Sequence, residues 1–209
     1  MEKKVNYNFL FYFIIFLQLL NSGCKDTSIG IKDSQNTPAN DSITYWLSEE
    51  NSSSDEDYSK NLSKAYDLAL QEKNDSLKSK HFSRLSYYYS LIGDSLRFRL
   101  SNNMALSLSE KIRDSNALAN NHWDLASFME DNAVKDSAYY HYTQAEKIFK
   151  SLKDGYSTAR VLYSLARVQS DIKDYTASEV TTIEAIELFK PLDKYYQLFL
   201  CYNNLGSVT

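Results

Sequence analysis

The chain has 209 residues, of which 43% are hydrophobic and 24% are charged, proportions typical of a soluble protein that builds a core. Its formal net charge of −4 provides no basic surface of the kind that binds nucleic acid. Five glycines and two prolines disfavour a turn-rich β-sandwich and suit long helices, and two cysteines make no disulfide framework.

The amino terminus has the pattern of an export signal. Two lysines precede an apolar run from residue 9 to residue 20, which is shorter than the ~20 residues of a membrane-spanning helix. Two small residues and Cys24 follow, and the arrangement resembles the signal of bacterial lipoproteins, in which that cysteine is acylated. The resemblance implies that residues 1–24 are a signal peptide and that lipid on Cys24 anchors the exported protein to a membrane. The alternatives are an ordinary cleaved signal, which would give a soluble periplasmic protein, and an uncleaved anchor.

The segment after the signal is polar. Residues 25–41 are rich in turn-forming residues and show no hydrophobic periodicity, so we expect a flexible tether. Residues 42–76 are expected to hold a short helix at 43–47, packed through Trp46, and part of a first helical repeat. A polar stretch at 51–57 separates these two parts.

The rest of the chain repeats itself every 40 residues. Three series keep this step: Leu85, Leu125, Leu165 and Leu205; Ala65, Ala105, Ala145 and Ala185; Leu68, Leu108, Ile148 and Leu188. Within each unit, apolar residues recur at three- and four-residue steps, which indicates helices, and a period of this length is typical of solenoids. We therefore expect complete helix-turn-helix units at 77–116, 117–156 and 157–196, and the first helix of an incomplete unit at 197–209.

Each unit resembles the tetratricopeptide repeat, whose first helix carries an aromatic residue, leucine, a small residue and tyrosine at fixed spacing. The best matches are Phe82, Leu85, Ser86 and Tyr89, with Tyr202, Leu205 and Gly206 in the last unit. The middle units have Met129 and Gln169 at the tyrosine position. The resemblance implies an all-α fold in which helix-turn-helix repeats stack as an α-solenoid with a right-handed superhelix. Because the family's period is about 34 residues, we expect longer helices here.

Aspartates recur where the helices are expected to meet. They are Asp94, Asp114, Asp136, Asp154 and Asp174. An aspartate at the start of a helix accepts hydrogen bonds from exposed backbone N–H groups. We therefore interpret these residues as helix N-caps and not as catalytic acids.

No catalytic or metal-binding pattern accompanies the repeats. The three histidines have no metal-ligand spacing, and the chain has no phosphate-binding glycine loop. His122 occupies the position that Phe82 and Leu162 hold in the neighbouring units, so we interpret it as a buried structural residue. We expect no enzymatic activity, no metal and no cofactor.

One surface carries a signal for binding. In stacked helical hairpins the first helices line the concave face. Outside the packing positions these helices present Lys80, Tyr87, Trp123, Arg160, Tyr163 and Arg167. Aromatic and arginine side chains are enriched at binding hot spots, and paired arginines suit a peptide carboxylate or an acidic segment. The alternative is that these side chains face solvent or pack against neighbouring helices.

These features predict a non-catalytic interaction scaffold, which binds a protein or peptide partner in the concave groove outside the inner membrane. The combination of an export signal with these repeats also resembles exported tetratricopeptide proteins of Bacteroidota. Some of those proteins are sensor regions of histidine kinases or transcriptional regulators, so a truncated sensor-input region is the alternative function. In the last helix we expect Leu198, Phe199, Tyr202 and Leu205 to be exposed, as at the opening of a longer solenoid.

Overall fold

A computed structural model describes residues 38–48 and 54–208, which belong to one compact unit spanning residues 37–209. The proposed signal peptide with Cys24, and nearly all of the proposed tether, lie outside the described residues. The described elements, in chain order, are α2 (Pro38–Leu47), α3 (Asp55–Gln71), α4 (Asp75–Leu91), α5 (Ser95–Lys111), α6 (Ser115–Asp131), α7 (Lys135–Ser151), α8 (Gly155–Asp171), α9 (Tyr175–Phe189), the 3-10 helix η2 (Lys190–Leu192) and α10 (Tyr195–Val208). None of the described helices is both long enough and apolar enough to cross a bilayer.

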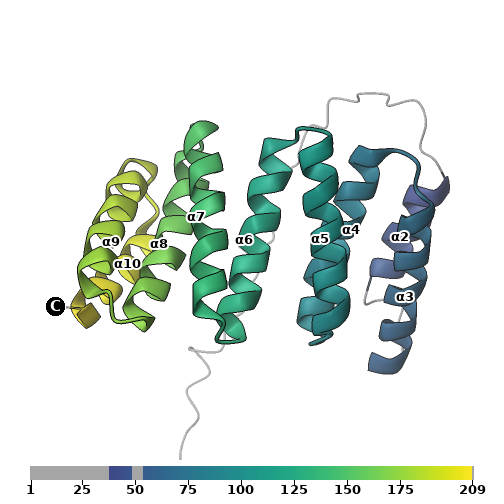
Figure 1. Ribbon diagram of the computed structural model, residues 1–209, viewed down its shortest axis with the longest axis horizontal. Helices are drawn as coiled ribbons and strands as arrows, with labels where there is room; N and C mark the ends of the chain where they lie inside the picture. Colours follow the sequence, from purple (N-terminus) through teal and green to yellow (C-terminus); the bar gives the residue numbers. More distant parts are fainter. Residues whose placement is uncertain (1–37, 49–53, 209) are drawn as a thin grey trace, which may run out of the picture. The chain divides into compact units, whose positions relative to one another are not determined.

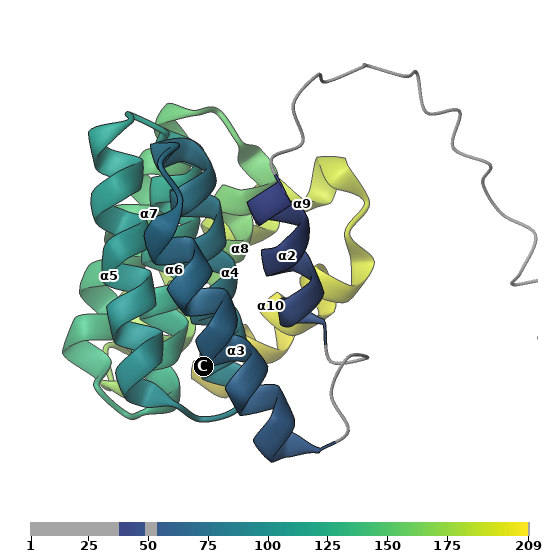
Figure 2. The ribbon, with the colours of Figure 1, turned by 90° about the vertical axis from the view of Figure 1, so that its right-hand side faces the viewer.

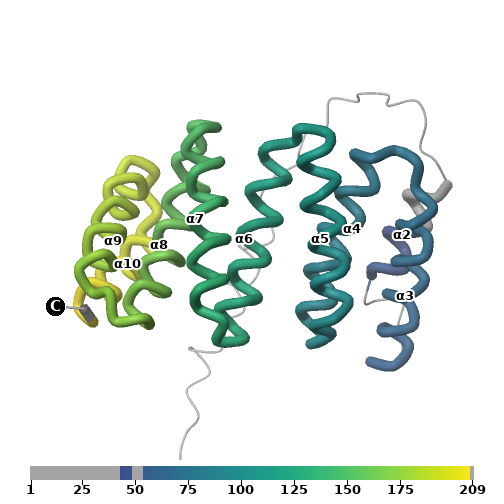
Figure 3. Tube along the Cα trace, in the orientation of Figure 1, coloured from purple at the N-terminus to yellow at the C-terminus, as the bar shows by residue number. Residues whose placement is uncertain are grey.

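The helices follow one another in a row within this unit (Figure 1). The most extensive packing joins α4 with α5, α6 with α7 and α8 with α9, so each pair is an antiparallel hairpin, as the tube trace shows (Figure 3). The first helices form one layer, in which α2 contacts α4, α4 contacts α6 and α8 contacts α10. Figure 2 looks along the row from the side of α2 and α3. This arrangement confirms the predicted all-α solenoid of stacked helical hairpins.

The geometry repeats every 20 residues, at half the period of the sequence. Each helix from α4 to α8 has 17 residues, and three-residue turns connect the helices both within and between hairpins. The middle residue of each turn has positive φ; these residues are Gly93, Arg113, Ala133, Lys153 and Lys173. In the first turn, the N–H of Gly93 donates to Ser90 O and the N–H of Asp94 to Tyr89 O, which is the Schellman pattern. The extra length over a 34-residue repeat therefore lengthens both helices of each hairpin.

Aspartate caps follow these turns directly. Asp94, Asp114, Asp154 and Asp174 each accept a hydrogen bond from the backbone N–H three residues later. The prediction for Asp136 was wrong, because Val134 holds the N-cap position of α7 and Asp136 lies in the first turn of that helix. The turn fixes the N-cap at the residue after the positive-φ position, so an aspartate two residues further on comes too late.

The residues of the 40-residue series form the core between the helices. The four alanines are completely buried, and Leu85, Leu125 and Leu165 are no more than 5% exposed. Small side chains at these points let the helix backbones approach, and large buried rings such as Phe82, Phe98 and Tyr142 fill the remaining space. The repeat thus encodes packing positions.

The predicted short helix before the first repeat is present and begins earlier, as α2. Its buried side chains are Ile43 and Leu47, whereas Trp46 is partly buried. The ammonium group of Lys64 lies 4.2 Å from the centroid of the Trp46 ring. Two aliphatic residues, and not the tryptophan alone, therefore anchor α2.

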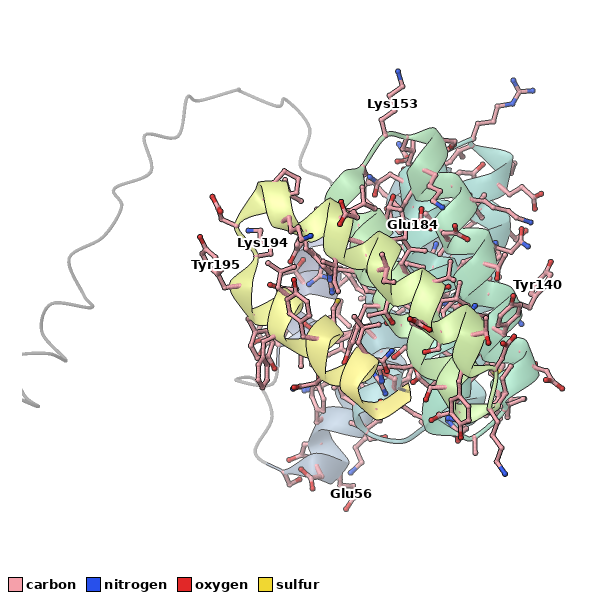
Figure 4. All side chains as sticks on the ribbon, turned by 90° about the vertical axis from the view of Figure 1, so that its left-hand side faces the viewer. Glu56, Tyr140, Lys153, Glu184, Lys194 and Tyr195 are labelled. Atoms are coloured by element: carbon pink, nitrogen blue, oxygen red, sulfur yellow. The ribbon has the colours of Figure 1, made fainter. Side chains whose placement is uncertain are left out.

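The last helix exposes aromatic side chains, in part as expected. Phe199 is 58% and Tyr202 is 53% exposed, and Tyr195 projects from the start of α10 (Figure 4). The expectation was wrong for Leu198 and Leu205, which are partly buried against the cluster formed by α8, α9 and Cys201 of α10. Because α10 packs on α9 and α8, its apolar residues divide between a covered side and an open one.

Candidate functional site

Two hollows lie on opposite flanks of α6 in the layer of first helices. The Trp123 pocket, of about 190 Å³, is lined by Trp123, Arg160, Tyr163, Ser164, Phe189, Gln197 and Leu200. The Asp124 pocket, of about 480 Å³, is lined by Tyr87, Ser90, Leu91, Gly93, Ser95, Phe98, Asp124, Ser127, Phe128, Asp131 and Asn132. Two consecutive residues of α6 thus line different pockets: Trp123 contributes an aromatic ring to one, and Asp124 contributes a carboxyl group to the other.

The Trp123 pocket brings together three of the predicted binding residues. The guanidinium carbon of Arg160 lies 4.1 Å from the ring centroid of Trp123 and 5.6 Å from that of Tyr156. Tyr163 lines the same pocket from α8. Aromatic faces attract a guanidinium through their quadrupole, so the arginine is held in place without a carboxylate. Among the described side chains, no ion pair is formed with Arg160.

Arg167 belongs to a different arrangement. Its Nη2 atom lies 2.9 Å from Oε1 of Glu130, whose side chain is only 7% exposed. The hydroxyl of Tyr142 donates to Oε2 of Glu130 at 2.8 Å. The network therefore ties α6, α7 and α8 together, and burial, followed by the charge of Glu130, raises the pKa of Tyr142. The carboxylate that the sequence suggested for Arg167 is supplied by the chain itself.

The two remaining predicted residues, Tyr87 and Lys80, belong neither to the Trp123 pocket nor to the network around Arg167. Tyr87 is 54% exposed and lines the Asp124 pocket. Lys80 is exposed on α4 and lines neither pocket. The six predicted residues thus lie in one helical layer without forming one site.

Asp124 was not among the predicted residues, although it follows Trp123 directly. It is partly buried, and this burial raises the pKa of its carboxyl to about 6. Within the described part of the chain, its side chain has no hydrogen bond or ion pair. A desolvated carboxylate in a cleft is a candidate for ligand binding. Its repeat equivalents, Arg84 and Ser164, give no sequence signal for this role.

Two histidines that are distant in sequence meet between α6 and α7. Nδ1 of His122 lies 3.1 Å from Nδ1 of His141, so one ring donates an N–H to the other. Burial, and secondarily the charge of His141, lowers the pKa of His122 to about 4. Within the described residues no third His, Cys, Asp or Glu joins the pair into a possible metal site. His122, which was interpreted as a buried structural residue, is only partly buried, and its ring contacts that of His141.

The histidine pair should make folding sensitive to acid. Because the pKa of His122 falls from 6.5 to about 4 on folding, its titration does not affect stability above pH 6.5 and destabilises the fold increasingly as the pH falls towards 4. Asp124 acts in the opposite direction, since its raised pKa makes folding more favourable as the pH falls through about 6. We expect the free energy of unfolding of His122→Phe, relative to the unchanged chain, to rise by about 1 kcal/mol from pH 7 to pH 5, allowing for partial exposure. Urea denaturation at both pH values measures this difference, and a pH-independent difference would contradict the role of His122.

Comparison with known proteins supports the fold. No family model matches the sequence, and a search of curated proteins gives no match. The crystal structure of BtubC (BKLC) from P. vanneervenii is similar, with a TM-score of 0.65 and 19% sequence identity. The match covers 72% of this chain and 63% of that chain, so this chain spans less than two thirds of its structural neighbour. At this identity, the likeness shows a shared helical-repeat fold.

Proposed function

We propose that this chain is a non-catalytic scaffold of the tetratricopeptide type, which binds a peptide or protein segment across the layer of first helices. The observation that carries the proposal is Arg160, whose guanidinium is stacked on Trp123 at 4.1 Å and lines a pocket. The sequence features of residues 1–24 support display outside the inner membrane through lipid on Cys24.

The chemistry of the Trp123 pocket favours a carboxylate ligand. A stacked guanidinium keeps its N–H donors in the plane of the group, where a carboxylate can accept two parallel hydrogen bonds. The ring of Trp123 packs edge-on against Phe149, which fixes the surface on which the arginine rests. The partner is therefore an acidic side chain or a peptide carboxyl terminus.

Replacing Arg160 with alanine should weaken binding of carboxylate peptides by about tenfold or more, because the charged hydrogen-bond donors are removed. Peptides that bind the immobilised chain are first selected from a library of random short peptides. Their affinity is then measured by fluorescence polarisation, with each carboxylate present and then converted to an amide.

Arg113→Ala is the matched control, because Arg113 is an exposed arginine on the turn between α5 and α6. We expect this variant to bind like the unchanged chain, and both variants to unfold at the same temperature. Equal affinity of Arg160→Ala and Arg113→Ala for the selected peptides would overturn the proposed binding mode.

A further inference from the structure

The lining of the Asp124 pocket is rich in hydrogen-bond acceptors, and two of its side chains already donate to the backbone. The hydroxyl of Ser90 donates to Tyr87 O at 2.7 Å, so its oxygen can only accept a further bond. One N–H of the Asn132 side-chain amide donates to Phe128 O at 2.7 Å, which leaves its second N–H as a donor and its carbonyl oxygen as an acceptor. The carboxylates of Asp124 and Asp131 add acceptors to the same lining. The lining also holds the hydroxyls of Tyr87 and Ser95, which can donate as well as accept, so it is the carboxylate of Asp124, unpartnered within the described part of the chain, that requires a donor from a ligand.

The charged side chains in the lining of the Asp124 pocket are carboxylates, and Arg99, whose guanidinium carbon lies 6.0 Å from the ring centroid of Phe128, is outside that lining. The lining contains no lysine, arginine or histidine. In the first turn of α5, Nη1 of Arg97 lies 3.3 Å from Oδ2 of Asp94, with which it forms an ion pair. Asp124 consequently has a desolvated carboxylate with no partner among the described residues, and its raised pKa follows from burial alone. Binding a cation would restore the stabilisation that the carboxylate loses on leaving water.

The remaining walls suit the stem of a long side chain. Phe98 and Phe128 stack with ring centroids 3.9 Å apart, and Leu91 and Tyr87 are more than half exposed on the α4 side. A volume of about 480 Å³ is enough for a side chain and its neighbouring backbone. Lysine and arginine combine an apolar stem with a donor-only cationic head.

We propose that the Asp124 pocket binds the cationic side chain of a lysine or arginine. The proposal rests on the proposed function for the source of this side chain, a peptide segment. Such a segment would carry a cation on one flank of α6 and a carboxylate on the other. The two pockets would then select peptides by the order of the positive and negative groups along the peptide as well as by their presence.

The direct test uses Nα-acetyl-arginine amide and Nα-acetyl-lysine amide as probes, with the citrulline and norleucine amides as uncharged counterparts. Each probe is titrated into the isotope-labelled full chain, and the backbone amide shifts of Gly93, Ser95 and Ser127 are followed by NMR. We expect saturable shifts with the cationic probes and none with the uncharged ones at equal concentration. Equal binding of both kinds of probe, or no binding of the cationic probes, overturns the proposal.

Asp124→Asn is expected to weaken binding of the cationic probes by about tenfold or more. The same change should raise the Tm by about 2–4 °C, because it removes a partly buried unpaired charge. Asp131→Asn is the matched control on the exposed part of the lining, where we expect at most about a twofold effect on affinity. A probe affinity unchanged by Asp124→Asn overturns the proposal, and the Tm shows that the variant is folded.

The peptide experiment separates this inference from the proposed function. If selected peptides depend on Arg160 while the cationic probes fail to bind, the carboxylate-binding function stands and the cation subsite falls. If the probes bind through Asp124 while no peptide depends on Arg160, the cation subsite stands and the proposed carboxylate recognition falls. Where both stand, replacing the lysine or arginine of a selected peptide with glutamine should cost as much affinity as Asp124→Asn.

Discussion

Replacing Phe82 with alanine is expected to lower the free energy of unfolding by about 3–5 kcal/mol. The side chain is completely buried, and its ring packs edge-on against Tyr66 with 5.4 Å between centroids. It lies in the cluster that joins α2, α3 and α4 to the next hairpin, so its removal leaves a cavity between helices. Chemical denaturation followed by circular dichroism measures the loss.

Phe199→Ala is the matched control for this prediction. Phe199 lies on α10 and is 58% exposed, so the same truncation should change the free energy of unfolding by no more than about 0.5 kcal/mol. Equal losses for the two variants would show that the burial of Phe82 between the helices does not stabilise the solenoid.

Replacing Arg167 with alanine should cost about 2–3 kcal/mol of unfolding free energy. The substitution leaves the buried carboxylate of Glu130 with the hydroxyl of Tyr142 as its hydrogen-bonding partner. Removing one partner of a buried ion pair is more costly than the pair's net contribution, because the other charge stays desolvated. We place the loss below that of a fully buried pair, since the Arg167 side chain is 49% exposed.

A double-mutant cycle with Glu130→Gln isolates this effect. In the Glu130→Gln background, Arg167→Ala should cost less than about 1 kcal/mol, because no buried negative charge is left unpaired. Arg160→Ala serves as the comparison within α8, since Arg160 is exposed and stacked on Trp123 without an ion pair. Equal costs of Arg167→Ala in both backgrounds would exclude Glu130 as the reason.

The backbone of the fold could be predicted because a solenoid reuses the same packing positions. A helix-helix contact that recurs in each hairpin needs a side chain of similar size at each recurrence, so the alanines and leucines of the 40-residue series reveal it. The 20-residue recurrence of the turns was missed for a related reason. The positive-φ position is filled by glycine, arginine, alanine and lysine in different turns, and one cap position holds Val134 instead of aspartate.

The chemistry of the candidate site was only partly predictable, because it depends on positions that do not repeat. Trp123 and Arg160 could be placed on neighbouring first helices, and the structure brings them into contact. Glu130 has serine at its equivalents, Ser90 and Ser170, so no repeating pattern links it to Arg167. Asp124 is partly buried because α4, the turn after it and α5 line the same pocket. The pattern of residues along α6 alone does not predict this burial.

The uniform length of helices and turns has a consequence for how such a chain can change over evolution. Each residue inserted into a helix rotates everything after it by about 100°, which would turn the buried face of the following helix away from its neighbours. A gain or loss of 40 residues instead joins one Schellman turn to another and leaves every later contact in phase. Diversification of this protein should therefore proceed by duplicating or deleting whole hairpins and by substitution at the non-repeating positions around α6, where the two pockets lie.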